Sequence, residues 1–212
     1  FLDLGNVLIR YDPDPAIQRF ADYTSLPAGG IFTTIAKEGL FEAYEEGRIT
    51  TEEFFEKIRR LTNCHLTLDR FRTIWEDTFS VNPFVEKTVK KLKGSYPLIL
   101  ISNTNDMHFP YIWNKFPVIR LMDEIVLSHK VGFIKPKKEI YLAALDIART
   151  DPERCLFIDD IEENINLIIK LAMLGGIFAV VILWFFLKNL RLTFVMMLTV
   201  PISIFTAFNL FY

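Results

Sequence analysis

The sequence predicts an α/β fold: a three-layer, doubly wound parallel sheet with an inserted helical cap. Two observations lead to this prediction. Short apolar segments alternate with segments of helical periodicity, which is typical of a parallel sheet covered by helices. Some 70 residues between the first and second apolar segments also carry their apolar side chains at helical spacing. We expect this insert to form a small bundle of its own.

Four apolar segments are the expected strands of the sheet. The first runs into Asp3, and the others cover residues 96–101, 124–128 and 154–158. A further helix is expected over residues 137–148, between the third and fourth strands. We therefore assign residues 1–12 and 93–165 to the core and residues 13–92 to the cap.

The cap is predicted to be helical from Ala16 to about Leu92, with breaks at residues 27–30 and at Gly47. Thr50 stands three residues before Glu53, which is the spacing of a capping box at a helix start. The aromatic residues of this segment are interpreted as its core. A cap in this position would cover the crevice at the end of the sheet, exclude water and select the substrate.

Polar residues follow three of the apolar strands. Asp3 ends the first strand, Ser102-Asn103 ends the second, and Asp159-Asp160 ends the fourth; Lys135-Pro136 lies between the last two. Ligands of parallel sheets bind outside the carboxyl ends of the strands, so we expect these residues to converge on one crevice.

The residue types at this crevice suit phosphoryl transfer. Asp3 can attack phosphorus and form an aspartyl-phosphate, as carboxylates do in covalent catalysis. Asp159 and Asp160 offer hard oxygen ligands for Mg²⁺. Ser102 and Asn103 can donate hydrogen bonds to phosphate oxygens. Lys135 adds a positive charge that would also hold the carboxylate of Asp3 ionised.

Four segments carry a resemblance to a known family. In chain order they are Asp3-Leu4-Gly5-Asn6-Val7-Leu8, Ile101-Ser102-Asn103-Thr104-Asn105, Gly132-Phe133-Ile134-Lys135-Pro136 with Glu139-Ile140-Tyr141, and Phe157-Ile158-Asp159-Asp160 with Asn164-Ile165. Over residues 1–165 the sequence thus resembles the haloacid dehalogenase superfamily, in particular its phosphatases with a helical cap of the first type.

The resemblance implies roles for these residues. Asp3 would be the nucleophile and a magnesium ligand, with the carbonyl of Gly5 as a further ligand. Asp160, supported by Asp159, would complete the metal site. The residues that would bind and stabilise the phosphoryl group are Ser102, Asn103 and Lys135. Many phosphatases of the family carry a second aspartate two residues after the nucleophile, as general acid and base, and Gly5 departs from that pattern.

We therefore expect a Mg²⁺-dependent hydrolase that acts on a small phosphorylated metabolite, for instance a sugar phosphate, in the cytoplasm. Up to Ile165 the chain has 21 Lys and Arg against 26 Asp and Glu, and it shows no basic patch suited to nucleic acid. Two alternatives remain open. One is a dehalogenase, and the other is a catalytically inactive domain joined to a membrane-embedded fragment of a transporter.

Residues 166–212 have a different composition. They contain Lys170, Lys188 and Arg191 and no acidic residue, and the uncharged stretches 171–187 and 192–212 predict two membrane-spanning helices. Residues 175–212 resemble the second and third transmembrane helices of resistance-nodulation-division efflux transporters. Such a hairpin would associate the chain with a membrane.

The positive-inside rule would place the basic turn of this hairpin in the cytoplasm and the first 170 residues on the opposite side. A cytoplasmic phosphatase conflicts with that topology, so we interpret the chain as a chimera of two gene fragments. The absence of an initiator Met and the short stretch before Asp3 lead us to expect a cut at the front as well. Alternatively, residues 166–183 supply a helix and the edge strand that complete the core.

Overall fold

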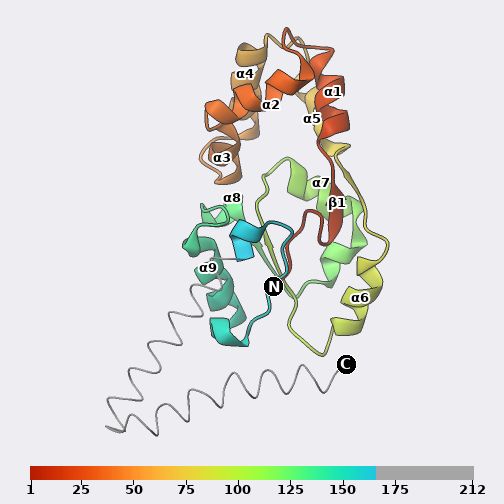
Figure 1. Ribbon diagram of the computed structural model, residues 1–212, viewed down its shortest axis with the longest axis vertical. Coiled ribbons are helices and arrows are strands. Elements are labelled where there is room, and N and C mark those ends of the chain that lie inside the picture. The colour runs from red at the N-terminus through yellow and green to blue at the C-terminus, as the bar shows by residue number, and fades with distance from the viewer. Residues whose placement is uncertain (166–212) are drawn as a thin grey trace, which may run out of the picture. The chain divides into compact units, whose positions relative to one another are not determined.

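The computed structural model describes residues 1–165 (Figure 1). The predicted hairpin over residues 166–212, and the alternative helix and edge strand over residues 166–183, lie outside the described residues. Within residues 1–165, none of the helices is both long and apolar enough to cross a membrane.

The sheet brings both ends of the described chain together. Strands β3 (Ile99–Ser102) and β4 (Glu124–Leu127) pair in parallel. Leu2 forms parallel bridges to Leu100 on one side and to Ile158 on the other. The order across the sheet is therefore β4, β3, the first residues of the chain, and the segment that precedes Asp159. This parallel order places the predicted strand ends at one edge.

Two predicted strands are reduced to single bridges, at Leu2 and at Ile158. The 3-10 turn η2 (Pro152–Arg154) ends at Arg154, where the second of these strands was expected to begin. Pro152 stands at the start of this turn, where its fixed φ is compatible with a helical turn. Four backbone hydrogen bonds still hold the first residues between their neighbours. Asp3 N donates to Ile158 O at 2.9 Å and Ile158 N to Phe1 O at 3.0 Å, while Leu2 N donates to Ile99 O and Ile101 N to Leu2 O, both at 2.9 Å.

Helices surround this sheet. The helix predicted over residues 137–148 is confirmed as α9 (Lys138–Ala148), which packs on β3 and β4. The other elements of this part are α6 (Val85–Leu92), α7 (His108–Lys115), the 3-10 turn η1 (Pro117–Leu121) and α8 (Ser128–Val131). A buried apolar cluster joins the sheet to α6, α7 and η1. The sheet therefore has its own hydrophobic core.

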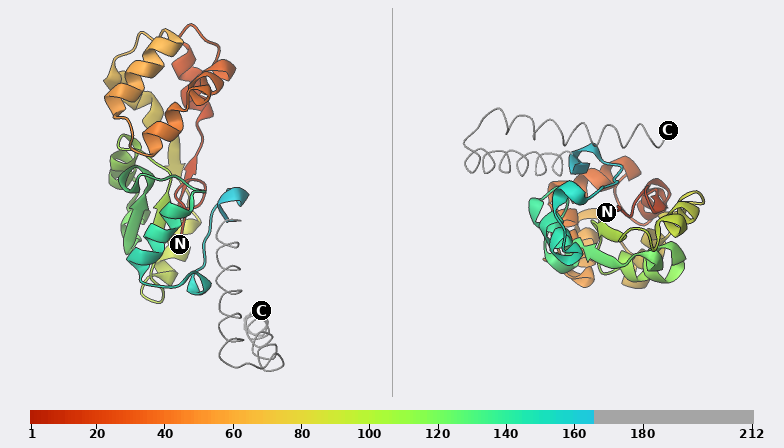
Figure 2. Two further views of the ribbon diagram at one scale, coloured as in Figure 1. Left: turned by 90° about the vertical axis from the view of Figure 1, so that its left-hand side faces the viewer. Right: turned by 90° about the horizontal axis from the view of Figure 1, so that it is seen from below.

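Five helices form the cap, which lies at the top of Figure 1 and again above the sheet in the left panel of Figure 2. They are α1 (Asp14–Ala21), α2 (Ala28–Lys37), α3 (Leu40–Glu45), α4 (Thr51–Thr62) and α5 (Leu68–Glu76). The predicted capping box is confirmed, because the Thr50 hydroxyl accepts from Glu53 N and the Glu53 carboxylate accepts from Thr50 N. Buried aromatic residues fill the cap, as expected, and Phe71 packs against Phe20 and Trp75.

The structure differs from the prediction over residues 79–92. Strand β2 (Phe79–Val81) pairs antiparallel with β1 (Ile9–Tyr11) and forms a two-stranded connection between cap and core. Helix α6 follows, and its buried Val89 belongs to the apolar cluster of the sheet. The sequence pattern instead predicts helix throughout this stretch, as part of the cap. A strand of three residues is too short to show an alternating pattern in the sequence. It is stabilised by its pairing with β1, which is distant in the chain and leaves no local signal.

Several contacts tie the cap to the core beside the sheet edge. Lys137, in the loop before α9, forms ion pairs with Glu42 at 2.8 Å and with Glu46 at 2.5 Å, both on or next to α3. Gly47 lies against the backbone carbonyl of His129 in α8. A side chain at residue 47 would overlap that carbonyl, so glycine permits the close approach.

We expect Gly47→Ala to destabilise the protein more than Gly39→Ala. Both glycines have a positive φ, 68° and 62°, in which alanine costs about 1–2 kcal/mol. A Cβ at Gly47 would lie 2.4 Å from His129 O, whereas one at Gly39 would have no neighbour within 4 Å. Urea denaturation measures both free energies of unfolding. Equal losses would contradict the proposed role of the Gly47 contact.

Candidate active site

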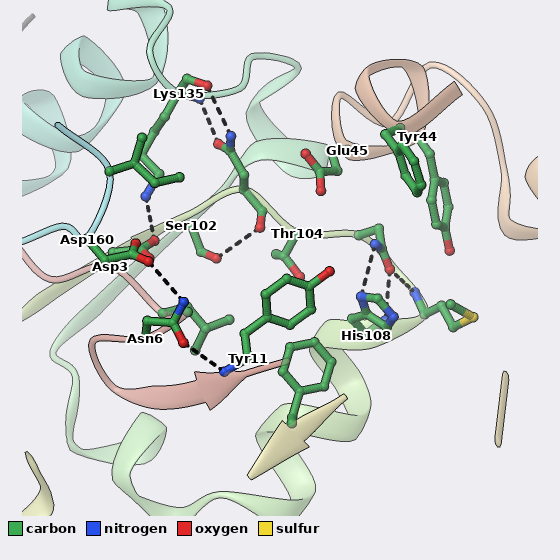
Figure 3. A pocket seen from close by; sticks show the side chains of 18 of the residues that line it. Asp3, Asn6, Tyr11, Tyr44, Glu45, Ser102, Thr104, His108, Lys135 and Asp160 are labelled. Atoms are coloured by element: carbon green, nitrogen blue, oxygen red, sulfur yellow. Dashed lines mark hydrogen bonds and ion pairs between the residues drawn. The ribbon is translucent and has the colours of Figure 1, made fainter. Parts of the chain in front are cut away.

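A buried ion-paired group lies at the carboxyl edge of the sheet (Figure 3). The Lys135 ammonium lies 2.5 Å from Asp3 Oδ1 and 2.6 Å from Asp159 Oδ2. The three side chains are only 3%, 10% and 0% exposed, respectively. Buried charges are tolerated when they are paired and hydrogen-bonded, and here one cation lies between two anions. The group therefore keeps a net negative charge.

Asp159 is held from several directions. Its Oδ1 accepts hydrogen bonds from Ile161 N at 2.8 Å and from Asn164 Nδ2 at 2.9 Å. The hydroxyl of Tyr141, in α9, donates to the carbonyl of Asn164 at 3.0 Å. These contacts leave Asp159 fixed behind the cavity, with Lys135 between it and Asp3.

Asp160 is exposed, and its carboxylate accepts a hydrogen bond from Asn6 Nδ2 at 2.9 Å. Asn6 adopts a left-handed backbone with φ of 54°, and its own Oδ1 accepts from Tyr11 N at 3.1 Å. Asp3, Asp159 and Asp160 each offer one oxygen, and these oxygens lie within 4.8 Å of one another. Hard carboxylate oxygens at this spacing fit a divalent cation such as Mg²⁺.

The side chain of Asn103 positions the lysine loop. Its Nδ2 donates to Lys135 O at 3.1 Å, and its Oδ1 accepts from Lys135 N at 2.7 Å. One amide proton of Asn103 therefore remains for a ligand. The Ser102 hydroxyl lies next to it and contacts Asn103 O at 3.3 Å. The predicted phosphate-binding residues are thus brought together, and Asn103 also sets the position of Lys135.

A cavity of about 340 Å³ opens beside this group, between sheet edge and cap. Six of the predicted site residues line it, namely Asp3, Gly5, Ser102, Asn103, Lys135 and Asp160. The cap and the β1–β2 connection contribute mainly aromatic side chains, which are Tyr11, Phe41, Tyr44, Phe54, Trp75 and Phe79. Glu45, at the end of α3, also faces the cavity (Figure 3). The cavity is thus charged on the side of the sheet edge, which we call its floor, and mostly apolar on the side of the cap, which we call its roof.

Burial shifts several pKa values in the cavity. It raises the pKa of Asp3 to about 6, and the neighbouring Lys135 offsets only part of this effect. The prediction from the sequence rests only on the charge of Lys135, which lowers this pKa, whereas desolvation has the larger effect and raises it. Burial also raises the pKa of Glu45 to about 7 and that of Tyr11 to about 12. The pKa of His108 falls to about 4, because its buried ring disfavours the charged form.

Sequence reasoning missed three polar residues of the site. Asn6 and Asn164 fall within the recognised segments, but nothing in their spacing shows that they would hold Asp160 and Asp159. Glu45 lies in the cap, and its place depends on how the cap docks on the core. Local sequence carries no signal for that docking.

Comparison with known proteins identifies the family. A family model described as a haloacid dehalogenase-like hydrolase matches residues 1–168. The chain belongs to this family. A curated relative, D-ribitol-5-phosphate phosphatase of Bacteroides thetaiotaomicron, is 27% identical over an alignment of 172 residues, and the match covers 78% of this chain and 84% of that protein.

Solved structures of the family share the fold. A HAD family enzyme of Bacteroides thetaiotaomicron, solved as a complex with magnesium and inorganic phosphate, has a TM-score of 0.73 and 29% identity. The match covers 80% of this chain and 88% of that one. A HAD-like family hydrolase from Porphyromonas gingivalis has a TM-score of 0.68 and 27% identity, with 80% and 85% covered. The α/β core with an inserted cap is therefore the fold of these relatives.

Replacing Lys135 with Met should destabilise the protein strongly. The variant would leave Asp3 and Asp159 buried without their cation, and breaking a buried pair typically costs about 3–5 kcal/mol. Denaturation in EDTA at pH 7 measures the loss, with Lys138→Met, at an exposed position, as the control. Equal stability of the two variants would contradict the role of the buried ammonium.

The raised pKa of Glu45 predicts a pH-dependent stability. The folded protein keeps this proton up to pH about 7, while the unfolded chain loses it near pH 4.5. The stabilisation of the folded state by that proton is thus complete at low pH and lost as the pH rises through this window. Glu45→Gln lacks this titrating group. As the pH rises from 4.5 to above 7, its free energy of unfolding relative to that of the unaltered protein should therefore increase, by at most about 3 kcal/mol.

Urea denaturation in EDTA at pH 4.5, 6 and 8 tests this prediction. Glu38→Gln is the matched control, because Glu38 is an exposed carboxylate of the same cap. A difference that stays constant with pH for Glu45→Gln would contradict the predicted titration.

Proposed function

We propose that this protein is a Mg²⁺-dependent phosphatase that hydrolyses small phosphate monoesters through an aspartyl-phosphate on Asp3. The observation that carries the proposal is the group formed by Asp3, Lys135, Asp159 and Asp160 beside the cavity between sheet edge and cap. A nucleophile, a cation and a set of carboxylates for a metal ion are the components that phosphoryl transfer requires.

In the first step, an oxygen of Asp3 forms a bond to phosphorus while the bond from phosphorus to the alcohol oxygen breaks. That oxygen leaves with a proton as the free alcohol. In the second step, water attacks phosphorus, the bond to Asp3 breaks, and inorganic phosphate leaves. With a pKa of about 6, Asp3 is mostly ionised at neutral pH and so can act as the nucleophile.

Asp3, Asp159 and Asp160, with the carbonyl of Gly5, are the groups that would hold Mg²⁺. Bound Mg²⁺ would neutralise part of the charge of the phosphoryl group and of these carboxylates. Lys135 would neutralise further charge of the phosphoryl group, and Ser102 with the free amide proton of Asn103 would orient the phosphate oxygens. The relative solved with magnesium and inorganic phosphate supports this assignment.

The substrate is proposed to be a small phosphorylated metabolite of the sugar or sugar-alcohol class. A cavity of about 340 Å³ is at the low end for small-molecule sites, which span about 300–1,000 Å³. The polar side chains of Asn105 and His108 lie among the aromatic residues and can meet substrate hydroxyls. The similarity to D-ribitol-5-phosphate phosphatase points to the same class.

The two alternatives fit the site less well. Displacement of a halide from carbon involves no phosphoryl charge, so a dehalogenase would have little use for a cluster of three carboxylates. A catalytically inactive domain would have no reason to keep Lys135 buried between two aspartates, since such a group is costly unless it serves a function.

The test is phosphate release from a panel of small phosphate monoesters by the full chain. We expect activity with Mg²⁺ that disappears in EDTA and falls by roughly 10³-fold or more in Asp3→Asn. Asp146→Asn, at an exposed position of α9, should keep full activity. Equal release by Asp3→Asn and the unaltered protein would reject the proposal, and chloride release from a haloacid would favour the dehalogenase.

A further inference from the structure

Gly5 leaves one catalytic step without a protein group. The oxygen that leaves phosphorus must gain a proton, because an alkoxide is a very strong base. Gly5 has no side chain to provide one, although a Cβ built there would face Asp3 Oδ2 at 3.9 Å and Tyr11 Cβ at 3.7 Å. The position beside the nucleophile is thus open to the cavity. Another residue of the cavity has to move the proton.

Besides Asp3, Lys135 and Asp160, the titratable side chains that line the cavity are those of Tyr11, Tyr44, Glu45 and His108. Three of them are poorly suited to general acid catalysis at neutral pH. His108 is neutral, because burial lowers its pKa to about 4. The hydroxyl of Tyr44 is engaged with the Thr51 hydroxyl at 2.6 Å. Burial raises the pKa of Tyr11 to about 12, so it is a weak acid.

Glu45 differs from these groups. Among residues 1–165 its carboxylate has no hydrogen bond or ion pair, whereas Glu42 in the same helix and Glu46 just after it are both paired with Lys137. Its carboxylate points toward the cavity from the side opposite Asp3 (Figure 3). An unpaired carboxylate that faces a ligand cavity is available to the ligand.

The structure also fixes where Glu45 points. The ion pairs of Lys137 hold helix α3 through residues three positions before and one position after Glu45. Gly47, two positions after it, contacts the carbonyl of His129. Lys137 is close in sequence to Lys135, so one loop of the core positions both the cation at the floor and the carboxylate at the roof.

We propose that Glu45 is the general acid and base of the phosphatase reaction and supplies from the cap what residue 5 lacks. This inference rests on the proposed function. In the first step the carboxyl proton of Glu45 passes to the leaving oxygen as the bond from that oxygen to phosphorus breaks. In the second step the Glu45 carboxylate takes a proton from the attacking water, as phosphorus bonds to water and separates from Asp3.

The surroundings of Glu45 suit this role. Burial raises its pKa to about 7, so both protonation states are populated near neutral pH, which is favourable for proton transfer. Lys135 lowers this pKa, and Glu45 in turn raises that of Tyr11. The neutral polar side chains that line the same cavity are those of Tyr44, His108, Asn6, Ser102, Asn103, Thr104, Asn105 and Asn164.

A leaving-group series tests the proposal. We would measure kcat/KM of the full chain with Mg²⁺ for substituted phenyl phosphates that differ only in the acidity of the phenol, and for simple alkyl phosphates without further hydroxyls. Glu45→Gln should match the unaltered protein for the most acidic phenol. It should lose about 10²–10³-fold for alkyl phosphates, because only poor leaving groups need the acid. Glu38→Gln should follow the unaltered protein throughout.

For each protein, the logarithm of kcat/KM is plotted against the pKa of the leaving alcohol or phenol. A purely structural or substrate-binding role of Glu45 would lower all rates by the same factor and leave the plots of Glu45→Gln and the unaltered protein parallel. Parallel plots would overturn the proposal. Glu45→Ala provides the same comparison should the Gln side chain perturb the cap, and binding of inorganic phosphate with Mg²⁺ by calorimetry should be unchanged in both. Gly5→Asp added to Glu45→Gln should restore the rates for alkyl phosphates, since the built Cβ has room beside Asp3.

This experiment separates the two proposals. If the unaltered protein fails to hydrolyse even the phosphate of the most acidic phenol, the proposed function is wrong, since that substrate needs no acid. If it hydrolyses that substrate and the plots of Glu45→Gln and unaltered protein coincide in slope, the function stands and the role of Glu45 is rejected.

Discussion

The ammonium of Lys135, buried between Asp3 and Asp159, is the interaction on which the rest of the site depends. Two carboxylates at the end of neighbouring strands repel each other, and burial makes that repulsion costly. The lysine makes their approach possible, and with it the insertion of the first residues between β3 and the segment before Asp159. The carboxylates still outnumber the cation, so the group retains the negative charge that favours a divalent cation.

The same loop connects the chemistry to the cap. Lys135 points into the sheet edge and is held there by Asn103, while Lys137 reaches Glu42 and Glu46 on the cap. Burial by itself raises the pKa of Glu46, but the ion pairs with Lys137 and Arg48 outweigh this effect and hold the pKa of its carboxyl below the usual range. A displacement of helix α3 would therefore disturb the loop that carries Lys135. The docking of the cap and the position of the Lys135 ammonium are therefore mechanically linked.

The sequence predicted the charged floor of the site better than its roof. Asp3, Ser102 and Asp159 follow apolar strands, and a parallel sheet brings such positions to one edge whatever the details of packing. The position of Glu45 has no comparable rule, because it depends on contacts between distant residues, such as Gly47 with His129. Strand β2 was missed for the same reason, since its pairing with β1 is set by a partner some 70 residues away.

A proton donor on the cap would change how the enzyme selects its substrate. With an aspartate at position 5, acid catalysis belongs to the core and is available to any phosphate that reaches Asp3. With Gly5 and a donor at Glu45, the proton is delivered only when the leaving group fills the cavity between the sheet edge and helix α3. A poorly fitting substrate would then bind its phosphate normally and yet react slowly. Selection would act on the chemical step, where differential stabilisation of the transition state is most effective.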